Sequence, residues 1–423
     1  TFSEAVKGFT NADITVQNGT LSTVTSLDGG ITWTGTFTPT SAITDTTNVI
    51  TVANASYTDV AGNTGFAGTS LNYEVDTKAP TVAITLSDSA LKVGETSVVT
   101  FTFSEVVKGF TNADITVQNG TLSTVTSLDG GITWTGTFTP TSAITDTTNV
   151  ITVANASYTD VAGNTGSAGT SLNYEVDMKA PTVAITLSDS ALKVSETSVV
   201  TFTFSEAVKG FTNADITVQN GTLSTVTSLD GGITWTGTLT PGFSSQDTSN
   251  VITLASASYT DVAGNTGSGG TSANYEVDTA QPWVATTLSD SALKLGETSV
   301  VTFTFSEAVT GFDNADITVQ NGTLSTVTSI DGGITWTGTF KPTSDIEDAT
   351  NSIRVNKSGY TDLIGNVGSS PGNSLNYEVD TKAPTVAITM NDSALKLGET
   401  SEVTFTFSEA VKGFTNADIT VQN

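Results

Sequence analysis

The sequence predicts an all-β protein made of tandem antiparallel β-sandwich domains, each about 101 residues long. Three observations support this fold class. One long segment recurs nearly unchanged at a domain-sized period. Within each copy, short runs of β-branched and aromatic residues alternate with polar residues and are separated by turn sequences. No segment shows the 3.6-residue apolar period of a helix.

The repeat period sets the expected domain organisation. The segment TFSEAVKGFTNADITVQNGTLSTVTSLDGGITWTGT starts at Thr1 and returns at Thr102, Thr203 and Thr304, and a fifth occurrence begins at Thr406. Spacings of 101, 101, 101 and 102 residues are those of whole small domains, because solenoid and blade repeats are only about 20–50 residues long. We therefore expect five copies, called first to fifth below: 1–78 (without its first strand), 79–179, 180–280, 281–382 and 383–423 (the N-terminal part of a further domain).

Seven short strands are expected in the second copy. Each is a run of β-branched and aromatic residues bounded by Gly, Asn, Asp or Pro, as is typical of strands and their turns. The clearest is SVVTFTFS, where Val99, Phe101 and Phe103 share one face and Val98, Thr100 and Thr102 the other. In order, the expected strands are 81–87, 97–104, 114–118, 121–128, 132–139, 150–158 and 171–176.

The connections between these strands indicate the type of sandwich. An Asn-Gly hairpin signal stands at 119–120 and an Asp-Gly-Gly turn at 129–131, whereas 140–149 is expected to be a polar connection and 161–166 a loop. Seven short strands with closely spaced turns predict an immunoglobulin-type sandwich, although the Cys…Trp…Cys signature of antibody domains is absent. Tryptophans on the apolar side of one strand are expected to serve the core rather than to stack on sugars: Trp33, Trp134, Trp235 and Trp336.

The composition excludes several classes of function. Asp and Glu number 42 against 14 Lys and Arg, a net charge of −28, which disfavours nucleic acid and anionic membranes and favours divalent cations. Without Cys or His, the chain lacks the usual residues of zinc, haem, iron–sulfur and copper sites and of thiol or His-based catalysis. No apolar run approaches the ~20 residues that cross a bilayer, so no direct membrane insertion is expected. Because the chain starts and ends within a repeat, we interpret it as a segment of a longer protein.

Acidic side chains are expected to gather at one end of each sandwich. In the immunoglobulin arrangement, the linker, the loop after the second strand and the loop before the last strand meet at the same pole. In the second copy these segments carry Asp76, Glu105, Asp114, Asp160 and Asn164. Crowded carboxylates repel one another unless a cation lies among them, and oxygen ligands without His or Cys fit Ca²⁺. The alternative, that these are ordinary turn-forming residues, stays open.

The same set of residues recurs at every junction. The third copy has Asp177, Glu206, Asp215, Asp261 and Asn265, and the fourth has Asp278, Glu307, Asp316, Asp362 and Asn366. Incomplete sets are Glu4, Asp13, Asp59 and Asn63 in the first copy and Asp380, Glu409 and Asp418 in the fifth. The fourth copy differs elsewhere, for example at Gln281 and Trp283, yet keeps the set. A second, thinner acidic group, Asp88 and Asp146, is expected at the opposite pole.

Three segments in fixed order resemble a known family. With DTKAPTV at the start of a copy, TFSEAV after the second strand and YTDVAGN before the last, the chain resembles along all 423 residues the bacterial Ig-like repeats of giant adhesins. These are type I-secreted, repeats-in-toxin (RTX)-type surface proteins of Gram-negative bacteria, and the likeness is strongest to the extender region of an ice-binding adhesin of an Antarctic marine bacterium. The resemblance implies an extracellular, calcium-stiffened stalk that holds a distal ligand-binding region away from the cell. It also implies that Asp76, Asp160 and Asn164 are junction ligands, although the third linker, DTAQP, departs from DTKAP.

We expect a non-catalytic spacer whose partners are the neighbouring repeats of the same chain and calcium ions, and which is a monomeric rod. In one alternative, the repeats themselves bind ice or glycans through outward threonine rows such as Thr133, Thr135 and Thr137. In another, chains associate head to tail in a filament or biofilm, with 383–423 of one chain completing 1–78 of the next by strand addition. An enzyme is not expected, since only a carboxylate pair could serve as catalyst.

Overall fold

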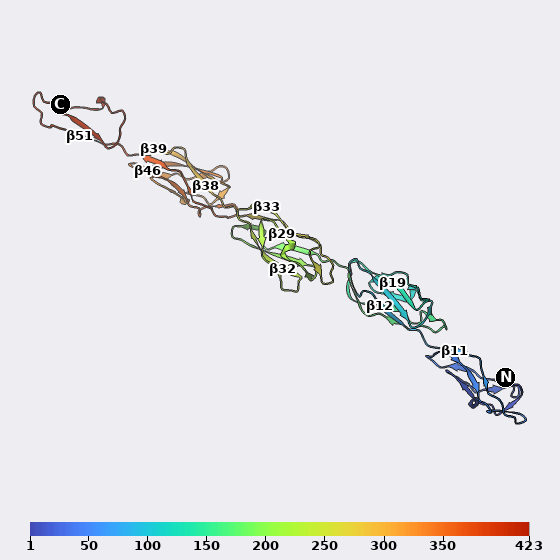
Figure 1. The fold of residues 1–423 in the computed structure, drawn as a ribbon. Coiled ribbons are helices and arrows are strands. Elements are labelled where there is room, and N and C mark those ends of the chain that lie inside the picture. Colours follow the sequence, from blue (N-terminus) through green and yellow to red (C-terminus); the bar gives the residue numbers. More distant parts are fainter. Residues whose placement is uncertain (423) are drawn as a thin grey trace. The chain divides into compact units, whose positions relative to one another are not determined.

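The structure is a computed structural model that describes residues 1–422, and these contain strands, turns and five single-turn 3₁₀ helices but no α-helix (Figure 1). The expected all-β class of repeated sandwiches is confirmed. The chain forms two compact units. One comprises Thr1–Val183, Phe204–Phe211 and Ser256–Gly269, and the other Ala184–Thr203, Thr212–Ala255 and the chain from Gly270 onward. Within the described residues, no helix has the length and apolar character that crossing a membrane requires.

One layer of the second copy is an antiparallel sheet made of β12 (Val82–Leu86), β14 (Ser97–Phe103), β17 (Gly120–Leu122), β18 (Thr126–Ser127) and β19 (Thr133–Pro140). The central strand β14 pairs with β12 and β19, and β19 also pairs with β17 and β18. Buried and more exposed positions alternate along β14, with Val99, Phe101 and Phe103 buried. This is the face that the sequence pattern predicts.

The opposing strands of the second copy form three smaller groups. They are β13 (Ala90–Lys92) with β24 (Tyr174–Asp177) and β20 (Thr145–Asn149), then β16 (Ile115–Val117) with β21 (Ile151–Val153) and β23 (Gly169–Thr170), then β15 (Val107–Lys108) with β22 (Thr159–Asp160). One pairing departs from the wholly antiparallel arrangement that we predicted, because β13 runs parallel to β24. After β12 the chain crosses to the other layer, so that Lys92 lies opposite Asp177 at the end of the copy.

One strand lies where the sequence predicted a polar connection. β20 occupies part of 140–149 and pairs with β24, with a register shift between Asp146 and Asn149. Its sequence, TDTTN, has no apolar alternation, so periodicity could not reveal it. The buried side chain of Asn149 holds it instead, since its Nδ2 donates to the carbonyl oxygen of Asp146 within the strand (2.9 Å) and to that of Tyr174 in β24 (3.1 Å).

Aromatic rings fill the core of the second copy. Phe103, Phe110 and Tyr158 meet edge to face, with ring centroids 4.9–6.1 Å apart. Trp134 is partly buried, packs against Phe110 at 5.6 Å and donates its indole N–H to the carbonyl of Gly131 at 3.2 Å. Burying each such side chain stabilises the fold by about 1.5–3 kcal/mol.

The fourth copy repeats this arrangement within the other unit. One sheet holds β38 (Val284–Leu288), β40 (Ser299–Phe305), β43 (Gly322–Leu324), β44 (Thr328–Ser329) and β45 (Thr335–Pro342). The smaller groups are β39 (Ala292–Lys294), β50 (Tyr377–Asp380) and β46 (Glu347–Asn351), then β42 (Ile317–Val319), β47 (Ile353–Val355) and β49 (Gly372–Asn373), then β41 (Val309–Thr310) and β48 (Thr361–Asp362). Sequence drift has left two buried hydroxyls, of Thr286 and Tyr360, without a hydrogen-bond partner within residues 1–422. In the second copy Ile84 stands in place of Thr286, and the Tyr158 hydroxyl donates to the carbonyl of Ser167 at 2.8 Å.

The remaining elements follow the same order along the chain. The first copy contains β1 (Val6–Lys7), β2 (Ile14–Val16), β3 (Gly19–Leu21), β4 (Thr25–Ser26), β5 (Trp33–Thr34), β6 (Phe37–Pro39), β7 (Thr44–Asn48), β8 (Ile50–Val52), β9 (Thr58–Asp59), β10 (Gly68–Thr69) and β11 (Tyr73–Asp76). The third contains β25 (Val183–Leu187), β26 (Ala191–Lys193), β27 (Ser198–Phe204), β28 (Val208–Lys209), β29 (Ile216–Val218), β30 (Gly221–Leu223), β31 (Thr227–Ser228), β32 (Thr234–Pro241), β33 (Gln246–Asn250), β34 (Ile252–Leu254), β35 (Thr260–Asp261), β36 (Gly270–Thr271) and β37 (Tyr275–Asp278). The fifth contains the antiparallel pair β51 (Val386–Met390) and β52 (Val403–Phe407). The 3₁₀ helices are η1 (Asn11–Asp13), η2 (Asn112–Asp114), η3 (Asn213–Asp215), η4 (Asn314–Asp316) and η5 (Asn416–Asp418).

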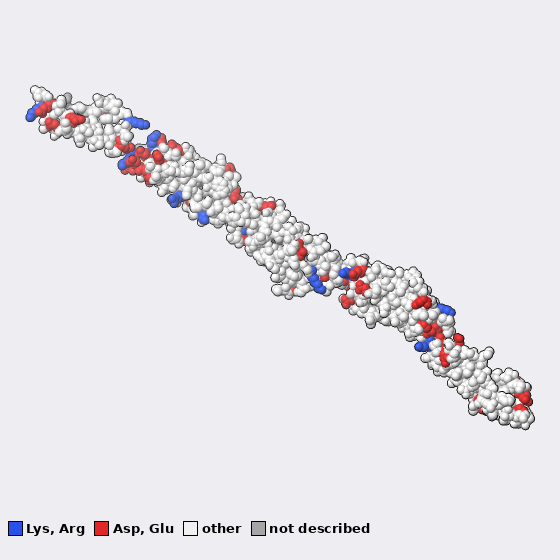
Figure 2. Space-filling view, viewed as in Figure 1, with Lys and Arg blue, Asp and Glu red and all other residues white. Residues whose placement is uncertain are grey.

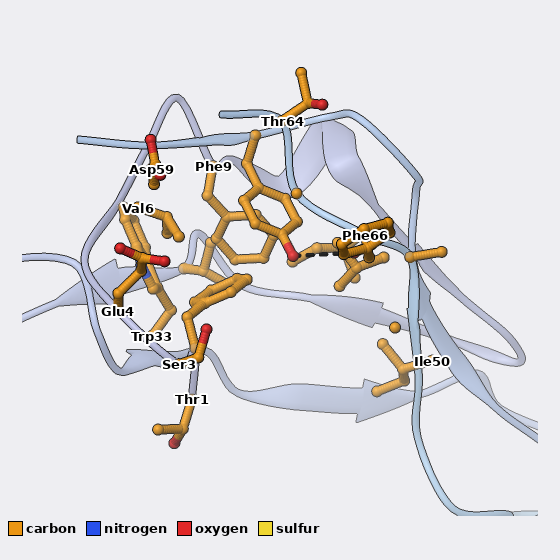
Figure 3. Close-up of a pocket in the computed structure, with 18 of the residues that line it drawn as sticks. Thr1, Ser3, Glu4, Val6, Phe9, Trp33, Ile50, Asp59, Thr64 and Phe66 are labelled. Carbon is orange, nitrogen blue, oxygen red and sulfur yellow. Dashed lines mark hydrogen bonds between the residues drawn. The ribbon is translucent and has the colours of Figure 1, made fainter. Parts of the chain in front are cut away.

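A hollow of about 780 Å³ lies in the first copy (Figure 3). Its lining includes the core-type residues Val6, Phe9 and Trp33. In the second copy the corresponding space is covered by β12, so that a Cβ added at Gly169 would lie 2.4 Å from Val82. At the equivalent Gly68 the nearest atom is 4.0 Å away, because the printed sequence has no counterpart of β12 ahead of this copy. The hollow is therefore the uncovered core of a sandwich.

Candidate metal centre at the repeat junctions

Three carboxylates come together where the first and second copies meet. Oxygens of Asp76, Glu105 and Asp160 all lie within 4.8 Å of one another. Asp76 ends β11 and lies opposite Thr44 of β7, so it is held in the sheet of the first copy. Glu105 is the second residue after the end of β14 and Asp160 ends β22, and both strands belong to the second copy. The group of three, called the triad below, therefore spans two copies.

Asp160 is held by hydrogen bonds within its own loop. Its side chain is only 1% exposed. Oδ1 accepts the main-chain N–H groups of Gly163 at 2.7 Å and Asn164 at 2.8 Å, and Oδ2 accepts from Asn164 Nδ2 at 2.7 Å. Gly163 closes the turn with a φ of +98°, which a residue with a side chain rarely adopts. The YTDVAGN segment thus sets a buried carboxylate in one fixed position at the junction.

The triad recurs at the next two junctions. Its members there are Asp177, Glu206 and Asp261, then Asp278, Glu307 and Asp362. Asp261 and Asp362 are buried and accept the same three hydrogen bonds from their loops as Asp160 does. The loop sequences differ, DVAGN in one and DLIGN in the other, so the shared Asp, Gly and Asn account for the shared geometry. Figure 2 shows that most of the visible surface carries no charged residue and that Asp and Glu gather in a few patches.

The negative charge of the first two triads is poorly compensated. Burial, followed by the charges of Asp76 and Asp160, raises the pKa of Glu105, and Lys78 opposes this shift. The pKa of Glu206 is raised in the same way by burial and by its two aspartate neighbours, with Lys179 opposing. Burial and, after it, the neighbouring carboxylates raise the pKa of these glutamates, and a bound cation would relieve the repulsion between the carboxylates.

The third triad lacks the nearby lysine. Burial, then the charges of Asp362 and Asp278, raises the pKa of Glu307, and here the opposing effect is a hydrogen bond from Gln246. Ala280 occupies the linker position that Lys78 and Lys179 hold at the other junctions. At this junction no linker lysine opposes the raised pKa of the triad glutamate.

The raised glutamate pKa values predict how stability depends on pH. A carboxyl group whose pKa is higher in the folded state stabilises the fold fully below its ordinary pKa of 4.5, and this contribution is lost as pH rises through the folded value. In chelator at pH 7, the variant E105Q/E206Q/E307Q should therefore melt a few degrees above the unsubstituted chain, and the gap should close toward pH 4.5. With a divalent cation bound, the variant should melt below the unsubstituted chain, because it has lost one carboxylate from each triad. Calorimetry at both pH values measures this, and equal melting in chelator at pH 7 would contradict it.

Asp114 and its counterparts lie outside the triads. Asp114 Oδ2 accepts the main-chain N–H of Thr111 at 2.7 Å and its hydroxyl at 3.2 Å, while Thr111 Oγ1 accepts the N–H of Ala113 at 3.3 Å. This reciprocal capping of η2 uses the carboxylate locally. The Thr-x-x-Asp spacing of a capping box is the sequence signal that could have indicated it. The same capping occupies Asp13, Asp215, Asp316 and Asp418.

Asn164 lies beside the first triad but presents its amide nitrogen to its neighbours. Nδ2 donates to Asp160 Oδ2 at 2.7 Å and to the carbonyl oxygen of Asp76 at 3.1 Å. Asn265 and Asn366 make the equivalent bonds to the carbonyls of their linker aspartates at 3.0 and 2.9 Å. This asparagine therefore ties the loop to the linker.

Two sets of expected residues are not brought into a group of three. Asp59 accepts hydrogen bonds from Asn63 N and Nδ2 at 2.8 and 2.6 Å, and Glu4 lies with Asp59 at the hollow of the first copy (Figure 3). Asp380 ends β50 and Glu409 follows β52. The printed sequence contains neither a linker aspartate ahead of Glu4 nor a YTDVAGN segment after Glu409, so each set lacks a member.

One junction position was missed by sequence reasoning. Thr145 Oγ1 donates to Asp177 Oδ1 at 2.9 Å. At the equivalent place in the third copy, Gln246 Nε2 donates to Asp278 Oδ2 at 3.1 Å and reaches Glu307 Oε2 at 3.5 Å. This position lies in the segment expected to be a polar connection. The pairing of β20 with β24 brings this position beside the linker aspartate. The sequence pattern does not reveal that pairing, so it did not connect the two residues.

The thinner acidic group expected at the opposite pole serves local turns. Asp88 Oδ1 accepts the N–H of Ala90 at 3.0 Å. Asp146 accepts the N–H of Thr148 at 2.9 Å and a hydrogen bond from Asn119 Nδ2 at 2.8 Å. Among the described residues, neither joins a group of acidic side chains close enough to share a metal ion.

The sequence profile of the bacterial Ig-like domain matches residues 1–75, 76–176, 177–277, 278–379 and 380–423. The chain belongs to the bacterial Ig-like domain family. Each match after the first begins at a linker aspartate, three residues before the boundary that we expected. The matches 76–176, 177–277 and 278–379 each contain a whole triad, and the first residue of each is the aspartate that ends the last strand of the preceding copy.

Three solved structures are similar to parts of these bacterial Ig-like repeats at low identity. The I9–I11 tandem from titin is 8% identical over 71% of this chain and 98% of that chain, with a TM-score of 0.27. The N-terminal part of the bacterial S-layer protein SbsC is 13% identical over 54% and 41%, with a TM-score of 0.18. The plexin A4 extracellular region is 10% identical over 85% and 41%, with a TM-score of 0.25. No curated protein matched the sequence.

Proposed function

We propose that this chain is a non-catalytic extender segment of a giant RTX-type bacterial surface adhesin, with Ca²⁺ at the repeat junctions stiffening it so that a distal ligand-binding region stands away from the cell. One observation carries the proposal: each triad takes one carboxylate from the last strand of one copy and two from the next. A cation bound there would join the two copies directly. The likeness of DTKAPTV, TFSEAV and YTDVAGN to adhesin repeats supports a location outside the cell.

The donor set of each triad fits calcium. Asp76, Glu105 and Asp160 each bring a carboxylate oxygen to the triad, and Ca²⁺ takes six to eight oxygen ligands, waters and main-chain carbonyls included, in a loose geometry. Mg²⁺ demands a near-octahedral site and keeps several of its waters, while Zn²⁺ favours the His and Cys residues that this chain lacks. The charge of a bound calcium ion would also offset the repulsion from Asp76 and Asp160, which adds to the effect of burial in raising the pKa of Glu105.

Junction stiffness is the mechanical property that such a site would supply. Without a cation, three carboxylates repel one another across a short linker, which favours separation of the two copies. With a cation, ligands from both copies converge on one point and the angle between them is restricted. Strands of six to ten residues, with loops and linker, give about 40 Å per repeat, so four stiffly joined repeats would reach on the order of 150 Å.

Small-angle X-ray scattering with and without chelator tests the stalk proposal. In calcium we expect a maximum dimension of about 150 Å or more, and in chelator a broader distribution of distances with a shorter mean, because the junctions bend. The matched control is E105Q/E206Q/E307Q, which keeps the fold but weakens every complete triad and should respond little to calcium. An unsubstituted chain whose scattering does not change on chelation would overturn the proposal.

A further inference from the structure

Consecutive copies also touch through a turn that contributes nothing to the triads. The main-chain N–H of Val93, in the turn after β13 of the second copy, donates to Asn265 Oδ1 of the third copy at 2.7 Å. The equivalent bond joins Val194 of the third copy to Asn366 of the fourth at 2.8 Å. In both cases the partners are 172 residues apart in the chain. The same contact is therefore present at two separate junctions.

Asn265 uses its whole side-chain amide in contacts with three segments. It is only 3% exposed. Nδ2 donates to the carbonyl oxygen of Asp177 at 3.0 Å and to Asp261 Oδ2 at 2.8 Å, while Oδ1 accepts from Val93. Oδ1 thus faces the turn of the second copy. Asn265 connects the linker, the triad aspartate and the turn.

The turn that meets Asn265 is formed by its own local contacts. Its residues are Lys92, Val93, Gly94 and Glu95. Glu95 Oε2 accepts the N–H of Lys92 at 3.1 Å, the N–H of Glu95 donates back to the carbonyl of Lys92 at 3.0 Å, and the two side chains pair at 3.7 Å. Gly94 takes a φ of +86°, which favours glycine. Because the turn is already ordered, docking on it requires little further loss of conformational entropy.

The lysine of this turn is less exposed in the two turns that contact the Asp-x-x-Gly-Asn loop of the next copy than in the turn that does not. The side chains of Lys92 and Lys193 are 39% and 37% exposed, whereas the equivalent Lys294 is 77% exposed. Lys92 Nζ lies 3.2 Å from where a Cβ on Gly264 would stand, and Lys193 Nζ lies 3.5 Å from the same point on Gly365. The copy after Lys294 has no YTDVAGN segment in the printed sequence. The difference in exposure therefore marks the docked surface.

We infer that the Lys-Val/Leu-Gly/Ser-Glu turn of each repeat is a docking site for the Asp-x-x-Gly-Asn loop of the next repeat, and that this contact needs no bound cation. The asparagine is its positioning residue. Two copies are then attached at the linker, the triad and the turn. A further point of attachment leaves two neighbouring copies less freedom to move relative to each other than a linker and one ion would.

Hydrogen–deuterium exchange of the full chain tests the docking turn. The turn segments 90–99, 191–200 and 292–301 differ in sequence, so mass spectrometry resolves them. In chelator, the amides of Val93 and Val194 should exchange about tenfold or more slowly than that of Leu295, which has no following asparagine in the printed sequence. Adding calcium should leave the difference in place.

Substituting the asparagine tests whether its side chain causes the slow amide exchange of the turn. Asn265→Ala should speed exchange in 90–99 and Asn366→Ala in 191–200, each without changing the other. Asn164→Ala is the matched control, because the printed sequence has no turn for it to meet, and it should change neither segment. Circular dichroism confirms that each variant is folded. Equal exchange of the three turns in the unsubstituted chain, or protection that appears only with calcium, would overturn the inference without touching the stalk proposal, which scattering decides.

Discussion

Saturating calcium should raise the melting temperature of the chain by roughly 10–20 °C over its value in chelator, and three ions should bind per chain. At a free calcium concentration of 100 times Kd, one site stabilises the copy that holds it by about 2.7 kcal/mol. In a domain of about 100 residues, each 1 kcal/mol shifts the melting temperature by about 4–8 °C. The effect is large because a domain of this size has a small entropy of unfolding, so a given gain in free energy shifts its melting temperature further.

Calorimetry together with metal analysis after equilibrium dialysis measures both quantities. The first and fifth copies have no complete triad, so a part of the transition should not respond to calcium. Mg²⁺ is the control cation and should shift the melting temperature much less, since the triads do not supply a rigid octahedral site. Melting that is the same in calcium and chelator, or dialysis that leaves the chain metal-free, would refute the calcium assignment.

Asp261→Ala should lower the ion count from three to two and destabilise the third copy by about 3 kcal/mol even in chelator. Asp261 is buried and accepts hydrogen bonds from the N–H of Gly264 and from both the N–H and Nδ2 of Asn265. Removing the carboxylate leaves these donors without their acceptor and opens the loop that holds the triad. Asp261→Asn keeps one acceptor oxygen and should lose the ion at a smaller cost in stability.

Asp215→Ala is the matched control in the same copy. Asp215 caps η3 through the N–H of Thr212 at 2.7 Å and belongs to no triad. Its removal should cost about 1 kcal/mol, as for other helix caps, and leave three ions bound. The triad assignment would be wrong if this variant lost an ion or if Asp261→Ala kept all three. Dialysis and calorimetry on the two variants side by side decide between these outcomes.

The parts of the fold that could be predicted are those whose signal is local. The buried face of β14 follows from the alternation of Val99, Phe101 and Phe103, because side chains on a strand point to opposite sides in turn. β20 could not be predicted, because TDTTN carries no such alternation and is held by the buried amide of Asn149. The parallel pairing of β13 with β24 joins segments more than 80 residues apart, which no local pattern reports.

The sequence by itself determined the repeat, the immunoglobulin-type sandwich and the pole at which Asp76, Glu105 and Asp160 meet. Each of these depends on the repeat period, on the alternation of residues along a strand or on the order of the loops, and all three are visible in the linear sequence. Only the tertiary structure showed which of the expected carboxylates share the site, since Asp114 caps a 3₁₀ helix instead. The physical reason is that a polar side chain takes the nearest complementary partner in space, and that partner is known only once the chain has folded.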